Sequence, residues 1–192
     1  MKAMQTFNQF LEELDNEEAS DDFQLRHVAQ DDAVDVAAVE AKIGFSLPTE
    51  LRELYLKNGA IRTAEYGDVW QTLKLDSANE MLEQHCGLCA HIDWVWGGRP
   101  ELPDELSASQ IKQLDADYIV FGSRYEDDNV HDYFFFDRLG RMDNLRLDQD
   151  DMSYAFQKFE LLLAGSPRSL SLEELLVEQL ALIRETIEDD YT

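Results

Sequence analysis

The sequence predicts an α+β fold, and three observations carry this prediction. Helix-forming segments come first, strand-forming segments lie in the middle and helix-forming segments close the chain, an order typical of α+β proteins. Residues 118–122 are a continuous apolar run, and residues 132–137 carry apolar side chains on both faces of a strand, which indicates buried strands. Several helix starts carry a capping box, in which Ser or Thr is followed three residues later by Glu or Gln.

The first half of the chain is expected to begin with helices. Thr6 and Gln9 match a capping box ahead of an apolar stripe at helical spacing. Residues 15–22 are an acidic connector. A second helix is expected between Asp32, a candidate N-cap, and Gly44, a candidate stop.

A third helix is expected to start at Pro48, because proline suits the first helical position. Leu51, Leu54 and Tyr55 would form its buried face, and Gly59 would end it. A strand is expected over 68–75. A helix is then expected from Ser77, with Met81, Leu82 and His85 on one face. An irregular stretch over 87–116 follows, in which Ser107 and Gln110 could cap a short helix.

The second half is expected to supply most of the sheet. Strands are predicted at 118–122 and 132–137, and Leu145 and Leu147 alternate in a third. Gly165 would end the next helix. Ser171 and Glu174 would cap a terminal helix.

The bulk composition limits the classes of partner. The chain has 192 residues, 41 acidic against 16 basic, and a formal net charge of −25. Such a surface repels nucleic acid and anionic membranes and attracts basic partners at long range. The N-terminal residues contain no apolar run of signal-peptide length, and two cysteines imply no disulfide framework, so a cytoplasmic location is expected.

The residues from Glu40 to Gly59 resemble the signature of the SUKH superfamily, the Smi/Knr-like domains. The matching pattern is a glutamate before Ile43-Gly44, then Leu47-Pro48, then a helix ending in Asn58-Gly59. The later blocks at Phe121-Gly122, 133–137, Gly140 and Phe156–Phe159 follow in the family order.

The resemblance implies a mostly antiparallel central sheet flanked by helices, with extra helices at both ends. The implied organisation is an N-terminal helix and connector over 1–30, the SUKH-like domain over 31–165 with an insertion at about 87–116, and a C-terminal helix over 166–192. Many bacterial relatives look like immunity proteins that neutralise a toxin domain, often a nuclease, and fungal relatives look like regulatory scaffolds. Neither role needs a catalytic group or a cofactor.

The stretch from Glu83 to Asp93 leaves three interpretations open. His85, Cys86, Cys89 and His91 could hold zinc, form a thiol redox site, or be ordinary residues near a helix end. Adjacent residues on a helix point about 100° apart, which disfavours a shared ion for the first two. We expect ordinary buried thiols and no metal, with a zinc or thiol enzyme as the alternative from another functional class.

Acidic residues near the ends of the predicted strands are the candidate partner-binding residues. They are Asp127, Asp128, Asp148, Asp150 and Asp151, with Trp70 as a possible aromatic anchor. The strands would project the acids to one end of the sheet. The sequence therefore predicts a non-enzymatic binding protein whose partner is a basic toxin domain, and a scaffold or regulatory protein is the runner-up. The pattern does not define an oligomeric state.

Overall fold

The structure is a computed structural model of the chain. It describes residues 2–14, 25–27, 32–63, 72–96, 106–126, 130–148 and 150–190. The elements in these ranges are, in chain order, α1 (Lys2–Leu14), β1 (Leu25–His27), α2 (Ala33–Ile43), α3 (Thr49–Lys57), β2 (Ile61–Thr63), β3 (Thr72–Leu75), α4 (Ala78–Glu83), α5 (Leu88–Trp96), α7 (Ala108–Asp117), β4 (Tyr118–Tyr125), β5 (Val130–Asp137), β6 (Met142–Asp148), α8 (Ser153–Leu163) and α9 (Leu172–Asp190). The predicted α+β class is confirmed.

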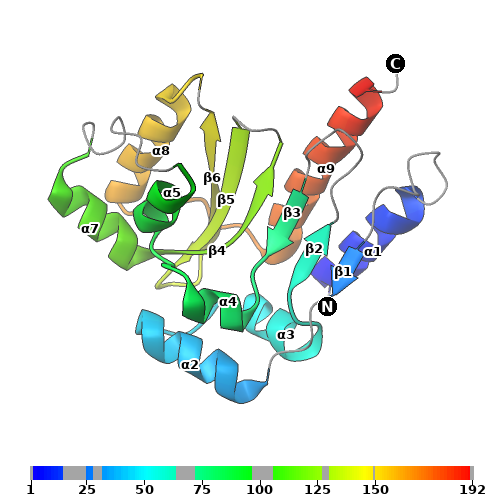
Figure 1. The fold of residues 1–192 in the computed structure, drawn as a ribbon, viewed down its shortest axis with the longest axis horizontal. Helices are drawn as coiled ribbons and strands as arrows, with labels where there is room; N and C mark the ends of the chain where they lie inside the picture. The colour runs from blue at the N-terminus through cyan, green and yellow to red at the C-terminus, as the bar shows by residue number, and fades with distance from the viewer. Residues whose placement is uncertain are drawn as a thin grey trace.

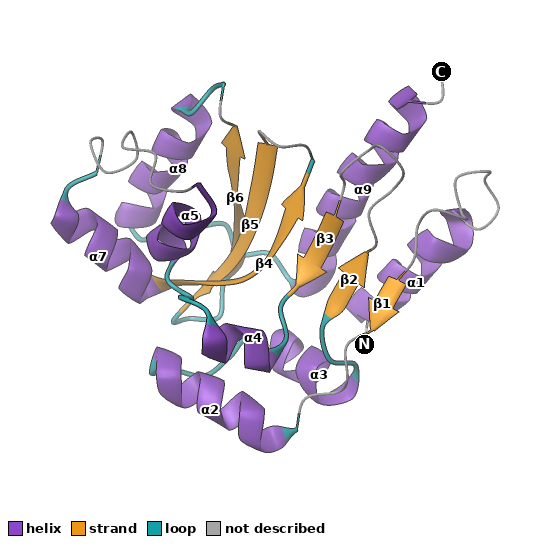
Figure 2. Ribbon diagram, viewed as in Figure 1, coloured by secondary structure: helices purple, strands orange, loops and turns teal. Residues whose placement is uncertain are grey.

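The strands form one antiparallel sheet in the order β1-β2-β3-β4-β5-β6, shown in Figure 2. β4, β5 and β6 are its long strands. Their register places Arg124 opposite Asp132 and Asp132 opposite Arg146, so these three side chains form a row across the sheet. The chain thus builds the antiparallel sheet that the family resemblance implies.

Each face of the sheet is covered by a separate hydrophobic core, which explains why β5 is apolar on both sides. Phe134 and Phe136 point into a core formed with α1, α2, α3, α4 and α9. Tyr133 and Phe135 point the other way, into a core formed with α5, α7 and α8. Figure 1 shows α1 beside α9 on one side of the molecule and α5, α7 and α8 together on the other.

The terminal helices are part of the first core. Phe7 of α1 and Leu176 of α9 are fully buried in it. Glu50 of α3 accepts a hydrogen bond from the backbone N–H of Leu172 at 2.7 Å, which ties the start of α9 to α3. Within the described residues, no helix combines the length and the apolar character that crossing a membrane requires.

Most of the predicted helix ends are confirmed. Asp32 accepts the N–H of Asp35 at 2.9 Å, and Gly44 and Gly165 have φ of 82° and 70° where α2 and α8 end. Capping boxes join Ser77 to Glu80, Ser107 to Gln110, and Ser171 to Glu174. These local signals locate elements well because each one satisfies backbone groups that the helix itself leaves unpaired.

Four predicted details are wrong. α1 already includes Thr6, so its capping box is not a helix start. Pro48 occupies the N-cap and α3 begins one residue later. α4 ends at Glu83, so His85 lies outside it, because Gln84 takes an extended backbone. The stretch expected to be irregular contains α5, whose apolar residue Leu88 is buried against the sheet, whereas the short helix expected from Ser107 is present as α7.

Candidate functional site

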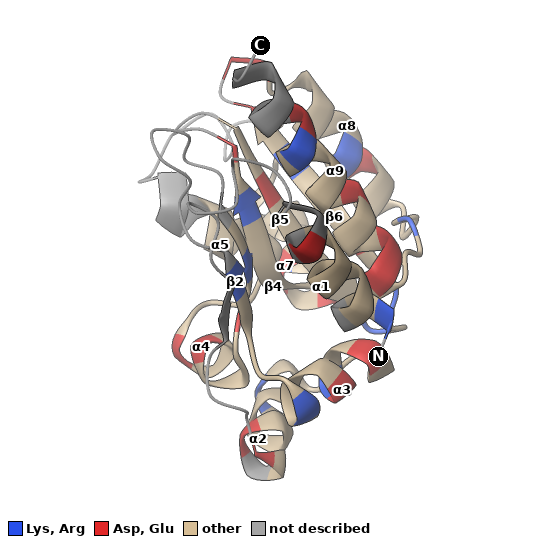
Figure 3. Ribbon diagram, turned by 90° about the vertical axis from the view of Figure 1, so that its right-hand side faces the viewer, with Lys and Arg blue, Asp and Glu red and all other residues tan. Residues whose placement is uncertain are grey.

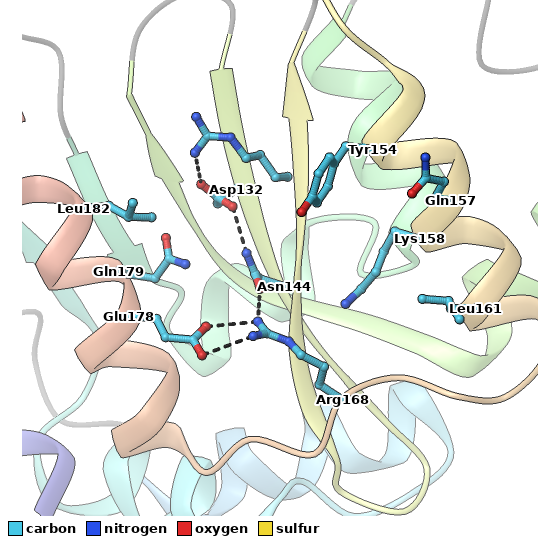
Figure 4. A pocket seen from close by; sticks show the side chains of 11 residues that line it. Asp132, Asn144, Tyr154, Gln157, Lys158, Leu161, Arg168, Glu178, Gln179 and Leu182 are labelled. Carbon is cyan, nitrogen blue, oxygen red and sulfur yellow. Dashed lines mark hydrogen bonds and ion pairs between the residues drawn. The ribbon is translucent and has the colours of Figure 1, made fainter.

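A groove runs between α8 and α9 over the ends of β5 and β6, with a volume of about 700 Å³. Figure 4 shows side chains entering it from three directions: from α8, from α9 and from the strands beneath. Its lining residues are Asp132, Asn144, Arg146, Tyr154, Gln157, Lys158, Leu161, Arg168, Glu178, Gln179 and Leu182. The groove combines apolar walls with a charged floor.

The α8 wall presents a second face of an otherwise buried helix. Ala155 and Phe159 point into the core. Tyr154 and Leu161 line the groove instead and are 71% and 52% exposed. Two large apolar side chains at this exposure, seven residues apart on one side of a helix, form a stripe that a partner can cover.

The floor is a row of charged side chains held by cross-strand pairing. The fully buried Arg124 donates to Asp132 at 2.7 Å and to Gln179 of α9 at 2.9 Å. The other carboxylate oxygen of Asp132 accepts a hydrogen bond from Asn144 at 2.8 Å, and Arg146 lies 3.5 Å from the first. These bonds tie α9 to the sheet and fix the depth of the groove.

The lower end of the groove is closed by a network around Asp143, whose side chain is fully buried. It accepts hydrogen bonds from Lys158 at 2.5 Å and from the Nε and backbone N–H of Arg168, both at 2.8 Å. Arg168 also reaches Glu178 of α9 at 3.0 Å. Burial alone would raise the pKa of Asp143, but the bonds from Lys158 and Arg168 outweigh it and lower that pKa.

The predicted acidic residues fall into two groups. Asp148 ends β6, opposite Val130 at the start of β5, and Glu126 at the end of β4 donates its N–H to the carbonyl of Val130. The ends of β4 and β6 therefore meet at one end of the sheet, as the sequence suggested. Asp127 and Asp128 lie outside the described residues, as does Trp70.

The three described acids also order the turn into α8. Asp148 accepts the N–H of Asp150 at 2.9 Å, and Asp151 accepts the N–H of Ser153 at 3.0 Å. The hydrogen bonds from Ser153 lower the pKa of Asp151. Asp150 and Asp151 are exposed, and Tyr154 follows Asp151 by three residues at the start of α8. This turn therefore places exposed acids just before the α8 wall of the groove.

The His85–His91 stretch is arranged as separate residues. Cys86 packs into the core that contains α9, and its thiol donates to the carbonyl of Met81 at 2.8 Å. Cys89 lies within α5 and packs into the other core. The two thiols thus serve different cores, and burial raises the pKa of Cys86 and raises that of Cys89 to about 12.

The two histidines of this stretch contact each other only through the backbone. The ring Nδ1 of His91 lies 3.4 Å from the carbonyl of His85. Burial lowers the pKa of His91, and the carboxylate of Asp76 acts in the opposite direction. Across the described parts of the chain, no three His, Cys, Asp or Glu side chains gather as metal ligands would.

The groove residues were missed from the sequence, although part of the signal was present. Tyr154 and Leu161 lie off the apolar stripe of α8, and such a second stripe is visible in the sequence. Arg168 gave no such signal, because its role depends on Asp143 and Glu178 coming together from distant segments.

Most basic residues are already engaged within the molecule. At least eleven of the sixteen Lys and Arg form ion pairs, namely Lys2, Arg52, Lys57, Arg62, Lys74, Arg124, Arg138, Arg141, Arg146, Lys158 and Arg168. Figure 3 shows acidic segments on α2, α4 and α9 with basic segments interspersed. Because 41 acids face only 16 cations, the surplus charge is acidic.

Comparison with known proteins assigns a family to most of this structure. Residues 32–163 match the family model described as the SMI1 / KNR4 family (SUKH-1). No curated protein matches the chain. The matched range includes β2 to β6, α8 and the floor of the groove, whereas Arg168 and α9 lie beyond it.

Proposed function

The chain belongs to the SMI1 / KNR4 family (SUKH-1), and from this premise we propose that it is a non-enzymatic binding protein for a basic protein domain. In its more specific form, the proposal is an intracellular immunity protein that neutralises a basic toxin domain, such as a nuclease. A scaffold or regulatory role with a different basic partner is the alternative that the experiment below separates.

The observation that carries the proposal is the internal pairing of the cations. At least eleven of the sixteen Lys and Arg side chains are already bound to an acid, and the net charge is −25. A field of that sign accelerates the approach of a basic protein and disfavours nucleic acid. The same field acts whether the partner is a toxin or a regulatory protein.

In this proposal, different residues attract the partner from a distance and hold it once it is bound. Asp148, Asp150 and Asp151, together with Asp127 and Asp128, would attract the partner to the upper end of the sheet. Exposed charges of this kind act mainly on the association rate, and salt screens them. Buried apolar contacts govern dissociation, and Tyr154 of the groove joins Trp70 as a candidate anchor.

The test is stopped-flow binding to a basic nuclease toxin domain, at several salt concentrations. We expect the association rate to fall at least about tenfold from low to high salt, as steered associations do. Changing the five aspartates to asparagine should flatten this dependence. Asparagine keeps the oxygen that caps the turn, so the turn before α8 should persist.

A matched control removes the same charge elsewhere. Five acids of α1, α2, α3, α4 and α7 serve this purpose, changed to the corresponding amides: Glu12, Asp35, Glu53, Glu83 and Asp117. If this control flattens the salt dependence equally, only net charge matters and the strand-end acids are not the docking surface. If the toxin domain does not bind but a basic host protein does, the regulatory role replaces immunity.

A further inference from the structure

Both walls of the groove present helix faces that the two cores leave unused. On α8, Tyr154, Lys158 and Leu161 lie at positions i, i+4 and i+7. On α9, Glu178 and Leu182 line the groove, and the exposed Glu185 continues that side at i+7. Figure 4 shows the side chains of α8 on one side of the strands and those of Glu178 and Leu182 on the other. Two such stripes form the sides of a channel whose apolar lining is Tyr154 and Leu161 on α8 and Leu182 on α9.

The sheet edge beside this channel is partly closed to strand addition. The carbonyl of Met142 accepts the N–H of Leu170 at 2.9 Å. The N–H of Asn144 donates to the carboxylate of Asp143 at 2.8 Å, and the same carboxylate accepts the backbone N–H of Arg168. A partner strand needs these main-chain groups free, so the first half of β6 is protected against it.

The charges of the channel differ from end to end. At its upper part, where Tyr154 and Leu182 lie (Figure 4), exposed Asp150 and Asp151 precede Tyr154 in the chain and exposed Glu185 follows Leu182 by three residues. Below these acids, Lys158 and Arg168 are both held by Asp143. A segment that enters the channel therefore meets acids outside the described ion pairs at the top and cations already bound to an acid farther down, which favours basic side chains at the top only.

We propose that this channel receives an amphipathic α-helix of the protein partner. Its apolar side chains would contact Tyr154, Leu161 and Leu182, and its Lys and Arg side chains would reach Asp151 and Glu185. A helix docks in such a groove through anchors at i, i+3 or i+4, and i+7. The two exposed side chains of α8 are seven residues apart, about 10 Å along the axis, which matches two turns of the docked helix. The inference rests on the proposed function and specifies the partner element that binds.

The experiment uses two displayed peptide libraries of equal size, selected against the full chain. One carries peptides about 18 residues long, or five turns, on a helix-forming scaffold. The other has proline at every fourth position, which prevents helix formation. We expect the helical library to be enriched in net-positive peptides with apolar residues at i, i+3 or i+4, and i+7. Selected peptides should bind at least about tenfold more tightly than their proline-substituted versions.

Two double variants locate the binding. Tyr154→Ala with Leu161→Ala should weaken the selected peptides at least about tenfold, as expected for loss of apolar anchors. Leu139→Ala with Val177→Ala is the matched control, because both residues are exposed apolar side chains outside the groove, at 78% and 49% exposure. The control should bind the peptides as the unchanged protein does.

The outcomes separate the inference from the proposed function. Helix docking would be overturned if both libraries yielded basic peptides equally, or if the Tyr154 and Leu161 double variant bound the peptides as tightly as the unchanged protein. Either result would still support a basic partner. Enrichment of alternating apolar and polar residues would indicate an added strand, and also overturns it. If neither library yields basic peptides, both the inference and the basic-partner proposal fail.

Discussion

Changing Asp143 to Asn tests whether the network around this residue stabilises the fold. Asp143 is fully buried on β6 and accepts bonds from Lys158 of α8 and from Arg168 on the connection to α9. Asparagine has nearly the same volume, so packing is preserved while the charge is lost. The substitution therefore reports on the electrostatic contacts alone.

The expected cost is about 3 kcal/mol of unfolding free energy. Each charge-assisted hydrogen bond is worth about 1.5–3 kcal/mol, and asparagine would lose the charge for both Lys158 and Arg168. Their side chains are 18% and 44% exposed, so water recovers part of the loss. Removing one partner of a buried pair costs about 3–5 kcal/mol, and the partial exposure places this case at the lower limit.

Urea unfolding followed by circular dichroism measures the effect. The control is Asp150→Asn, because Asp150 is an exposed acid two residues after the end of β6. This substitution should change the unfolding free energy by less than about 0.5 kcal/mol. A loss below about 1 kcal/mol in Asp143→Asn would refute the reasoning. A double-mutant cycle with Lys158→Met should give a coupling energy of about 1 kcal/mol or more.

Asp143 also makes the unfolding free energy depend on pH. The pKa of Asp143 is lowered in the folded state, so the unfolded chain takes up a proton first as the pH falls. The stabilisation is fully present above the unfolded pKa of about 4 and is lost as the pH falls toward the folded pKa. The difference between the unchanged protein and Asp143→Asn should therefore shrink below about pH 4.

Three further measurements test other parts of the structure. Gly122→Ala should lower the unfolding free energy by about 3 kcal/mol, because the new Cβ would overlap a backbone carbonyl of β3. Gly44→Ala should lower it by only about 1 kcal/mol, because its φ of 82° is the sole source of strain. Equal losses of unfolding free energy in urea would contradict this. Cys86 and Cys89 should resist a thiol reagent at pH 8 until urea unfolds the protein, because burial raises the pKa of both thiols. Rapid labelling of both thiols in the folded protein would contradict this prediction. Burial lowers the pKa of His91, so unfolding free energy should fall as the pH drops below about 6.5, and an equally steep fall in His91→Gln would show that another group is responsible.

Local rules predicted much of the fold because they act within a few residues. The box at Ser77 and the stop at Gly44 were both correct. Leu51 and Leu54 are buried as their spacing indicated. Periodicity was less reliable where segments are short: the three-residue strands β1 and β2 are too brief to show alternation, and they gain stability only from pairing with neighbours.

The candidate site could be predicted only in part, because it depends on contacts between distant segments. The convergence of strand ends near Asp148 follows from alternating strand direction and was predicted. The groove requires α9 to lie beside β6, and that placement is fixed by Gln179 bonding to Arg124. No pattern in the sequence links residues 55 positions apart. The sequence therefore shows Tyr154 off the apolar stripe of its helix, but it does not predict that Tyr154 lines a groove.

The acids of this chain fall into two classes that separate stability from binding. Asp132 and Asp143 are buried and hold the cations that tie the helices to the sheet. Asp150 is exposed, and exposed charges contribute little to stability but much to long-range attraction. Neutralising a buried acid should thus lower the unfolding free energy, and neutralising the exposed acids should lower the association rate. If the exposed acids instead destabilised the fold when neutralised, the surplus charge would have a structural role and the basic-partner proposal would lose its main support.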